Sequence, residues 1–151
     1  MTKTTSYEIS KKLKEAGFDA EADYNFIERN NQKAFLVNIK ELSGIEIMNE
    51  IGVFIKSYDL ETIIDALPES ITLKYKSKKN GKVREFRETL KIDKYEIHYL
   101  CNDIENADDT NRYFNEYGYW PQFSVYNFSN TGSLANAAGK MWLMLKEKGL
   151  V

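Results

Sequence analysis

The chain has 151 residues, enough for one domain with a substantial apolar core. Its hydrophobic content of 42% and charged content of 29% are typical of a globular protein, and a net charge of -2 indicates no particular partner. A single cysteine, Cys101, excludes an internal disulfide, and no apolar run approaches the roughly 18 residues of a membrane-spanning helix. We therefore expect one globular domain over residues 1–151 that is cytoplasmic and carries no signal peptide.

The first predicted element is a short helix that begins at Thr5. Thr5 and Glu8 have the spacing of a capping box, in which each side chain accepts a hydrogen bond from a free backbone N–H. Ile9 and Leu13 then fall on one face. Gly17 is placed to end this helix, because glycine readily adopts the left-handed conformation that follows a last turn.

Residues 23–40 predict a β-hairpin with Asn30-Asn31 in its turn. Tyr24 and Phe26 alternate on one side of its first strand, and Phe35, Val37 and Ile39 alternate on the next run. The stretch 41–56 is ambiguous between helix and strand, and we interpret it as a helix-like turn followed by a short strand.

A second short helix is predicted from Asp59, a favourable N-cap residue, to Pro68, which prevents continuation. Tyr58 and Ile63 have the spacing of a hydrophobic staple across its first turn. Two turns fit between these limits.

Asn80-Gly81 between two alternating runs is the strongest local signal in the chain. This pair is typical of a two-residue type I′ hairpin turn, and that turn sets Tyr75 opposite Phe86. A third strand over residues 95–99 would complete an antiparallel meander.

The remainder of the chain predicts a long acidic loop over 102–118, a strand through Phe123 and Tyr126, and a final helix over 133–148. The final helix carries a broad apolar stripe: Leu134, Ala138, Met141, Trp142 and Leu145. The expected fold class is therefore α+β, an antiparallel meander sheet with helices packed on one face, because the strands come in runs without strict alternation with helices.

Catalytic and metal-binding patterns are weak. His98 and Cys101 are the only residues of their kinds, and three positions apart on a strand they point to opposite faces, which is poor geometry for a thiolate and its base. One histidine and one cysteine leave too few ligands for the usual four-ligand structural zinc site, and the acidic loop lacks the glycine of a calcium loop. We assign no catalytic residue, metal or cofactor.

The stretch from Lys74 to Lys94 is strongly basic, with nine basic residues against three acidic ones. Four of them are expected on the face away from Tyr75 and Phe86: Lys74, Lys76, Lys78 and Arg87. A basic two-stranded ribbon can lie in a nucleic-acid groove, although lysines also protect exposed sheet faces from unwanted pairing.

The densest aromatic group lies in or beside the predicted acidic loop: Tyr113, Tyr117, Tyr119 and Trp120. Tyrosine and tryptophan are enriched at protein interfaces, so these rings are a candidate recognition surface. Alternatively, the same rings fold inward and cover the core.

Three stretches resemble small uncharacterised proteins encoded by phages and prophages of gut bacteria: residues 6–18, residues 58–68, and the closing residues 134–138 with Trp142-Leu143 and Gly149-Leu150. Those proteins likewise open with a lysine-rich helix ending in Gly-Phe, here Gly17-Phe18, and close with an alanine-rich helix. The resemblance implies a mobile-element origin and life in a bacterial cytoplasm, and it transfers no functional residue.

The leading hypothesis from the sequence is a non-enzymatic accessory protein that binds an unidentified protein partner through Tyr113, Tyr117, Tyr119 and Trp120. The alternative is a nucleic-acid-binding module that uses the basic hairpin over residues 71–92. An enzyme with the acidic loop as its active site is the third hypothesis.

Overall fold

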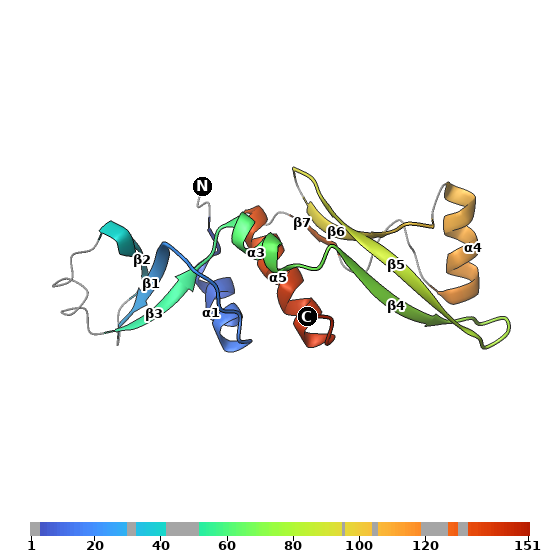
Figure 1. Ribbon diagram of the computed structural model, residues 1–151, viewed down its shortest axis with the longest axis horizontal. Helices are drawn as coiled ribbons and strands as arrows, with labels where there is room; N and C mark the ends of the chain where they lie inside the picture. Colours follow the sequence, from blue (N-terminus) through green and yellow to red (C-terminus); the bar gives the residue numbers. More distant parts are fainter. Residues whose placement is uncertain are drawn as a thin grey trace.

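A computed structural model describes residues 4–29, 33–41, 52–94, 96–103, 106–118, 127–129 and 133–151. The molecule is elongated, with one sheet towards each end and helices between them (Figure 1). The smaller sheet has the strand order β2-β1-β3, formed by Phe35–Asn38, Tyr24–Glu28 and Val53–Ser57. The larger sheet has the order β4-β5-β6-β7, formed by Ser70–Lys76, Val83–Ile92, Glu96–Cys101 and Asn127–Ser129. All described pairings are antiparallel.

The predicted α+β class is confirmed. Helices α3 (Leu60–Ala66) and α5 (Leu134–Glu147) lie at the centre of the molecule, beside α1 (Tyr7–Glu15), and α4 (Ala107–Tyr117) lies at the far end of the larger sheet (Figure 1). The helices cover the face of the larger sheet that carries its buried side chains: Ile71, Leu73, Phe86, Ile97 and Tyr99. The three-stranded sheet was not predicted, because β3 pairs with β1 across a long stretch of chain.

The final helix forms as predicted. The Ser133 side chain accepts a hydrogen bond from the Asn136 backbone N–H, and Gly149 ends the helix with a φ of 72°. Trp142 is buried, and the centroid of its ring lies 4.9 Å from that of Phe18. Phe18 follows α1, so this contact links α5 to the N-terminal part of the chain. Helix α5 therefore joins the two halves of the molecule, since it contacts α1 and α3 on one side and β6 and β7 on the other.

The predicted start of α1 is wrong by one residue. Ser6 is the N-cap and accepts from the Ile9 N–H, so no capping box forms between Thr5 and Glu8. The Thr5 hydroxyl instead accepts from the Tyr58 N–H at 3.0 Å, next to the backbone bond from Thr5 N–H to the Tyr58 carbonyl. Because Thr5 makes these contacts with Tyr58, the residue before the α3 N-cap, the Ser6 hydroxyl caps α1 instead.

The first hairpin forms, and the side of β1 that carries Tyr24 and Phe26 faces outward. Asn25 and Ile27 are buried, whereas Tyr24 is exposed and Phe26 is half-buried against the Tyr7 ring. The strand alternates in polarity as predicted, but the larger aromatic rings lie on the outer side. Asn30-Asn31 and residues 42–51, to which we assigned a turn and a helix-like segment, lie outside the described residues.

The second hairpin forms with a register two residues from the prediction. Leu73 pairs with Phe86, and Tyr75 pairs with Arg84. The turn is longer than a two-residue type I′ turn, because the Ser77 N–H donates to the Lys82 carbonyl and the Ser77 carbonyl accepts from the Gly81 N–H at 2.9 Å. A shift by two residues leaves the side chains within β4 and β5 on their predicted faces.

The predicted acidic loop over 102–118 is wrong, because most of this stretch is α4. The Asn106 side chain accepts from the Asp109 N–H at 3.0 Å, and Gly118 closes the helix with a φ of 71°. Asp108 and Asp109 lie in the first turn, where the helix dipole favours negative charge. The predicted strand over 123–126 lies outside the described residues.

Candidate functional site

The candidate site is the distal end of the β4–β5 hairpin together with α4, which we call the hairpin end and define as residues 76–84 and 106–118. Helix α4 is fixed to the hairpin by backbone and side-chain contacts. The Lys78 N–H donates to the Glu116 carbonyl at 2.8 Å, and the Ser77 hydroxyl donates to a Glu116 carboxylate oxygen at 3.2 Å. The loop and the helix therefore form one supported unit.

An aromatic cluster lies under this unit. The Phe86 ring lies 5.4 Å from Tyr113 and 5.1 Å from Tyr117, in both cases edge to face. The Arg84 guanidinium stacks over Phe86 and Tyr113, at 5.1 and 5.4 Å, and pairs with Asp103 at 3.4 Å. Arg84 thus belongs to the support of the site, and its charge is balanced by an acid.

The predicted aromatic recognition surface is corrected by these contacts. Tyr113 is 5% exposed, and Tyr117 is half-buried beside Phe86. These two rings cover the core, which is the alternative that the sequence left open. Tyr119 and Trp120 lie outside the described residues.

The predicted basic residues divide into two groups. Lys74, Lys76 and Arg87 are exposed on the outer face of the sheet as expected, although Lys74 pairs with Glu85 at 3.6 Å and Arg87 donates to the Ser70 hydroxyl. Lys78 is not on that face, because it lies in the loop next to α4.

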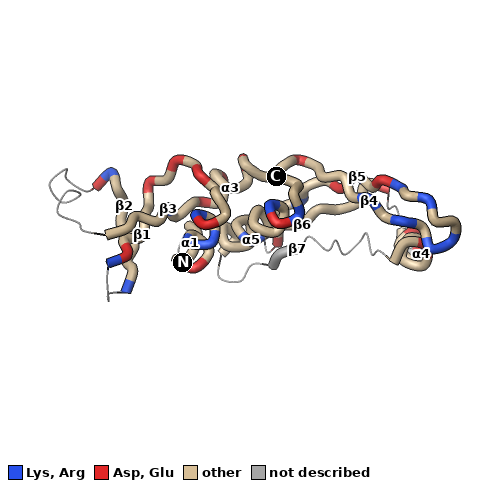
Figure 2. The backbone as a smooth tube through the Cα atoms, turned by 90° about the horizontal axis from the view of Figure 1, so that it is seen from below, with Lys and Arg blue, Asp and Glu red and all other residues tan. Residues whose placement is uncertain are grey.

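Four lysines surround the hairpin tip: Lys76, Lys78, Lys79 and Lys82. All four are exposed, and none forms an ion pair with any residue in the described ranges. Figure 2 shows several basic stretches of backbone along the hairpin at the α4 end of the molecule, with acidic stretches in α4 beside them and residues of both signs along the rest. The hairpin tip is therefore a local region of positive charge on a chain whose net charge is -2.

An open depression of about 640 Å³ lies between the loop and α4, and Lys78, Lys79, Arg112, Asn115 and Glu116 line it. Arg112 pairs with Asp109 three residues earlier, at 3.1 Å. The sequence did not indicate Arg112 as a site residue, because its stretch was interpreted as loop. Three cationic side chains and one amide in this lining are donors that suit an anionic ligand. The one carboxylate, that of Glu116, accepts a hydrogen bond from Ser77.

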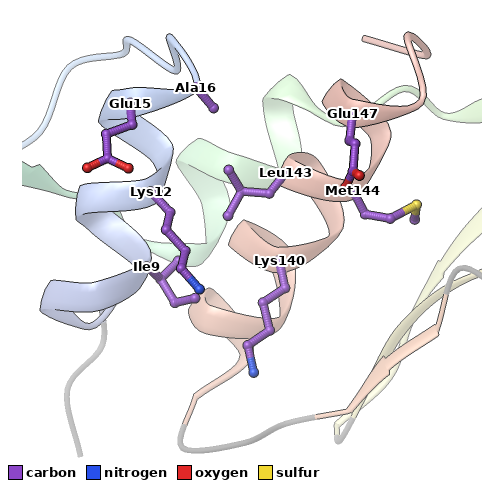
Figure 3. A pocket seen from close by; sticks show the side chains of 8 residues that line it. All are labelled: Ile9, Lys12, Glu15, Ala16, Lys140, Leu143, Met144 and Glu147. Atoms are coloured by element: carbon purple, nitrogen blue, oxygen red, sulfur yellow. The ribbon is translucent and has the colours of Figure 1, made fainter.

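A wider groove of about 720 Å³ runs between α1 and α5 (Figure 3). Its lining alternates apolar and charged side chains of both signs: Ile9, Lys12, Glu15, Ala16, Lys140, Leu143, Met144 and Glu147. The mixed charges favour neither anions nor cations.

His98 and Cys101 lie on opposite faces of β6, as predicted. Cys101 is buried on the inner face, and burial raises the pKa of its thiol, with the nearby Asp103 and Glu88 carboxylates adding to the shift. The thiol therefore stays protonated at neutral pH and is a poor nucleophile. His98 instead lies near the carboxylates of Asp93 and Glu96.

Comparison of the chain with known protein families, with characterised proteins and with solved structures found no match. Among the described residues, no helix has the length and apolar character needed to cross a membrane.

Proposed function

We propose that this chain is a non-enzymatic binding module that contacts nucleic acid through its hairpin end. The observation that carries the proposal is the set of four exposed tip lysines without an acidic partner in the described ranges, at one end of an elongated molecule. Phosphate neutralisation by lysine and arginine supplies most of the non-specific affinity of such proteins. A bacterial cytoplasm and a phage or prophage origin are part of the same proposal.

The shape of the hairpin end supports this function. Two-stranded β-ribbons are one of the elements that enter nucleic-acid grooves. The β4–β5 ribbon projects beyond the central helices, and α4 packs on only one of its faces (Figure 1). The other face, with Lys76 and Arg87, continues the basic surface from the tip.

A protein partner is the second candidate. It is favoured by Val83, which is 62% exposed beside the tip lysines and offers an apolar contact. An acidic protein would contact the same lysines as a phosphate backbone. The two candidate functions therefore share one surface, and they are distinguished by which ligand binds there more tightly.

The test is binding of fluorescent duplex DNA and of hairpin RNA, measured by anisotropy at several salt concentrations. The triple variant Lys76→Gln, Lys79→Gln, Lys82→Gln should lower the slope of log affinity against log salt by about 0.9 for each phosphate of duplex DNA that the variant no longer neutralises. The control variant Lys12→Gln, Lys33→Gln, Lys148→Gln removes the same charge from exposed positions elsewhere and should keep the original slope.

Two results would contradict the proposal. One is the absence of salt-sensitive binding to either nucleic acid by the unmodified chain. The other is equal weakening in the two triple variants, which would mean that overall charge rather than the hairpin tip controls binding. Tighter binding to polyglutamate than to either nucleic acid would favour the acidic protein partner.

A further inference from the structure

Three possible metal ligands converge where β5 turns into β6, at the opposite end of the hairpin from the basic tip. One ligand atom from each of Asp93, Glu96 and His98 lies within 4.8 Å of the other two. The His98 Nδ1 atom is 3.5 Å from a Glu96 carboxylate oxygen. Two ligands of one tetrahedral zinc ion, each about 2.0–2.2 Å from the metal, are separated by a similar distance.

The local fold explains this convergence. Glu96 and His98 are two residues apart on β6, so their side chains point to the same face of the sheet. An Asp93 carboxylate oxygen accepts from the Glu96 N–H at 2.9 Å, and the Asp93 N–H donates to the Glu96 carbonyl. The turn therefore holds Asp93 next to the first residue of the strand.

The environment of His98 also indicates a ligand. The Nδ1 atom is buried, and within the part of the chain that the structure describes it makes no hydrogen bond. A buried polar atom of this kind normally has a partner. The imidazole is held beside two carboxylates. Lys91 lies opposite His98 on β5, and Lys94 follows Asp93 in the turn; both lysines are exposed.

The donor set selects the kind of ion. One imidazole nitrogen with two carboxylate oxygens suits zinc and neighbouring first-row transition metals, whereas magnesium and calcium prefer oxygen ligands alone. Three protein ligands leave a fourth position for water. The single histidine and single cysteine of the chain exclude only a four-ligand structural site built from those two residue types, and a site with carboxylate ligands stays open.

We propose that Asp93, Glu96 and His98 bind a divalent transition-metal ion, with Zn²⁺ as the ion to test. The site lies on the outer face of the larger sheet and is separate from the proposed nucleic-acid surface. Access is through Asp93 and Glu96, which are exposed and partly exposed.

The experiment uses the tag-free full chain, because a histidine tag would itself bind zinc. His98 is the only histidine, so its imidazole NMR signals report on one site without further assignment. We expect Zn²⁺ to shift these signals saturably at one ion per chain, and Mg²⁺ at the same concentration to leave them unchanged.

Two conservative variants separate a three-ligand site from a lone histidine. Asp93→Asn keeps the oxygen that accepts from the Glu96 N–H, and Glu96→Gln keeps the side-chain shape, so both should fold. Each should weaken Zn²⁺ binding about tenfold or more, a range typical of removing support from a metal site. Glu69→Gln, which removes an exposed carboxylate outside the cluster, should bind as the unmodified chain does.

No saturable shift of the imidazole signals with Zn²⁺ would overturn the proposal. Unchanged Zn²⁺ affinity in both Asp93→Asn and Glu96→Gln would also overturn it, because the histidine would then bind alone. Equal weakening in Glu69→Gln would show that overall negative charge, not this cluster, attracts the ion.

Discussion

Gly139 lies at a close contact between α5 and α1. A Cβ atom at this position would lie 2.6 Å from Ile9 Cγ2 and 3.4 Å from Leu13 Cδ1. In an open helix, Gly→Ala gains about 1 kcal/mol of stability from helix propensity. Here overpacking costs about 1–3 kcal/mol, so we expect Gly139→Ala to give no gain or a net loss in urea unfolding.

The control for this prediction removes the clashing atom. In an Ile9→Ala background the Cγ2 atom is absent, and Gly139→Ala should then stabilise the chain relative to Ile9→Ala alone. The two effects of Gly139→Ala must therefore differ in a double-mutant cycle. Equal effects in both backgrounds would mean that α1 and α5 are not in contact at this point.

Tyr99 makes the stability depend on pH at the alkaline end. Its ring is fully buried and its hydroxyl donates to the Pro68 carbonyl at 2.7 Å, so burial raises the pKa of the phenol. The unfolded chain then loses this proton near pH 10 while the folded chain keeps it. Folding stability contributed by the neutral phenol is therefore complete below about pH 10 and is lost as the pH rises above it.

The comparison with Tyr99→Phe isolates this effect, since phenylalanine does not titrate. The variant should be less stable at pH 8, because it lacks the hydrogen bond, and the gap in unfolding free energy should narrow between pH 9 and 11. A constant gap over that range would show that Tyr99 ionises equally in the folded and unfolded chain.

At the scale of elements, α4 depends on its N-cap. Asn106 accepts from the Asp109 N–H, and replacing an N-cap asparagine with alanine costs about 0.5–2 kcal/mol. Asn106→Ala should speed hydrogen exchange of the amides over 110–117, which α4 and its contact with the hairpin protect. Asn106→Asp keeps the acceptor and adds a negative charge, which is favourable at the helix start, so it should retain slow exchange.

Fast hydrogen exchange of the amides over 110–117 in the unmodified chain would contradict a stable α4 and would favour the loop predicted from the sequence. The same experiment reports on the candidate site, since the Glu116 carbonyl accepts from Lys78 in the hairpin loop. Loosening α4 should therefore also speed exchange at Lys78.

Elements with local signals were predictable from the sequence. Asp59 caps α3 as expected, the final helix starts at the predicted place with Ser133 as its N-cap, and Gly17 follows α1 with a φ of 86°. Features set by distant contacts were not predictable. The α1 cap is Ser6 because Thr5 bonds to Tyr58, more than fifty residues away, and β3 joins a separate sheet for a similarly non-local reason.

The candidate site was predictable in part. Its lysines are visible as a basic run, and the alternation of the strands gave the correct faces despite the register error. Helix α4 was missed because its first turns, with Asp108 and Asp109, resemble a solvated loop. Arg112 was therefore missed as a site residue, and the inward position of Tyr113 was only one of two alternatives. The sequence did not predict that Asp93 lies close to His98, because this proximity depends on the geometry of the turn between them.

At the scale of the whole molecule, the main apolar core and the basic hairpin tip lie in different regions. The central helices and the inner face of the larger sheet contain the main core, whose members include Leu13 and Leu145. The basic tip lies outside this core, at the end of the β4–β5 hairpin. Charge changes at the tip should therefore alter binding without unfolding the chain, because Lys76, Lys79 and Lys82 are exposed.

The most direct measurement is a map of backbone amide NMR shifts on adding a short DNA duplex at low salt. If the hairpin end is the binding surface, shifts will concentrate at residues 76–87 and in the second half of α4, around Arg112. Residues 7–28, in α1 and β1, will remain unchanged. Shifts centred on α1 and β1, or spread evenly over the chain, would contradict a nucleic-acid surface at the hairpin end.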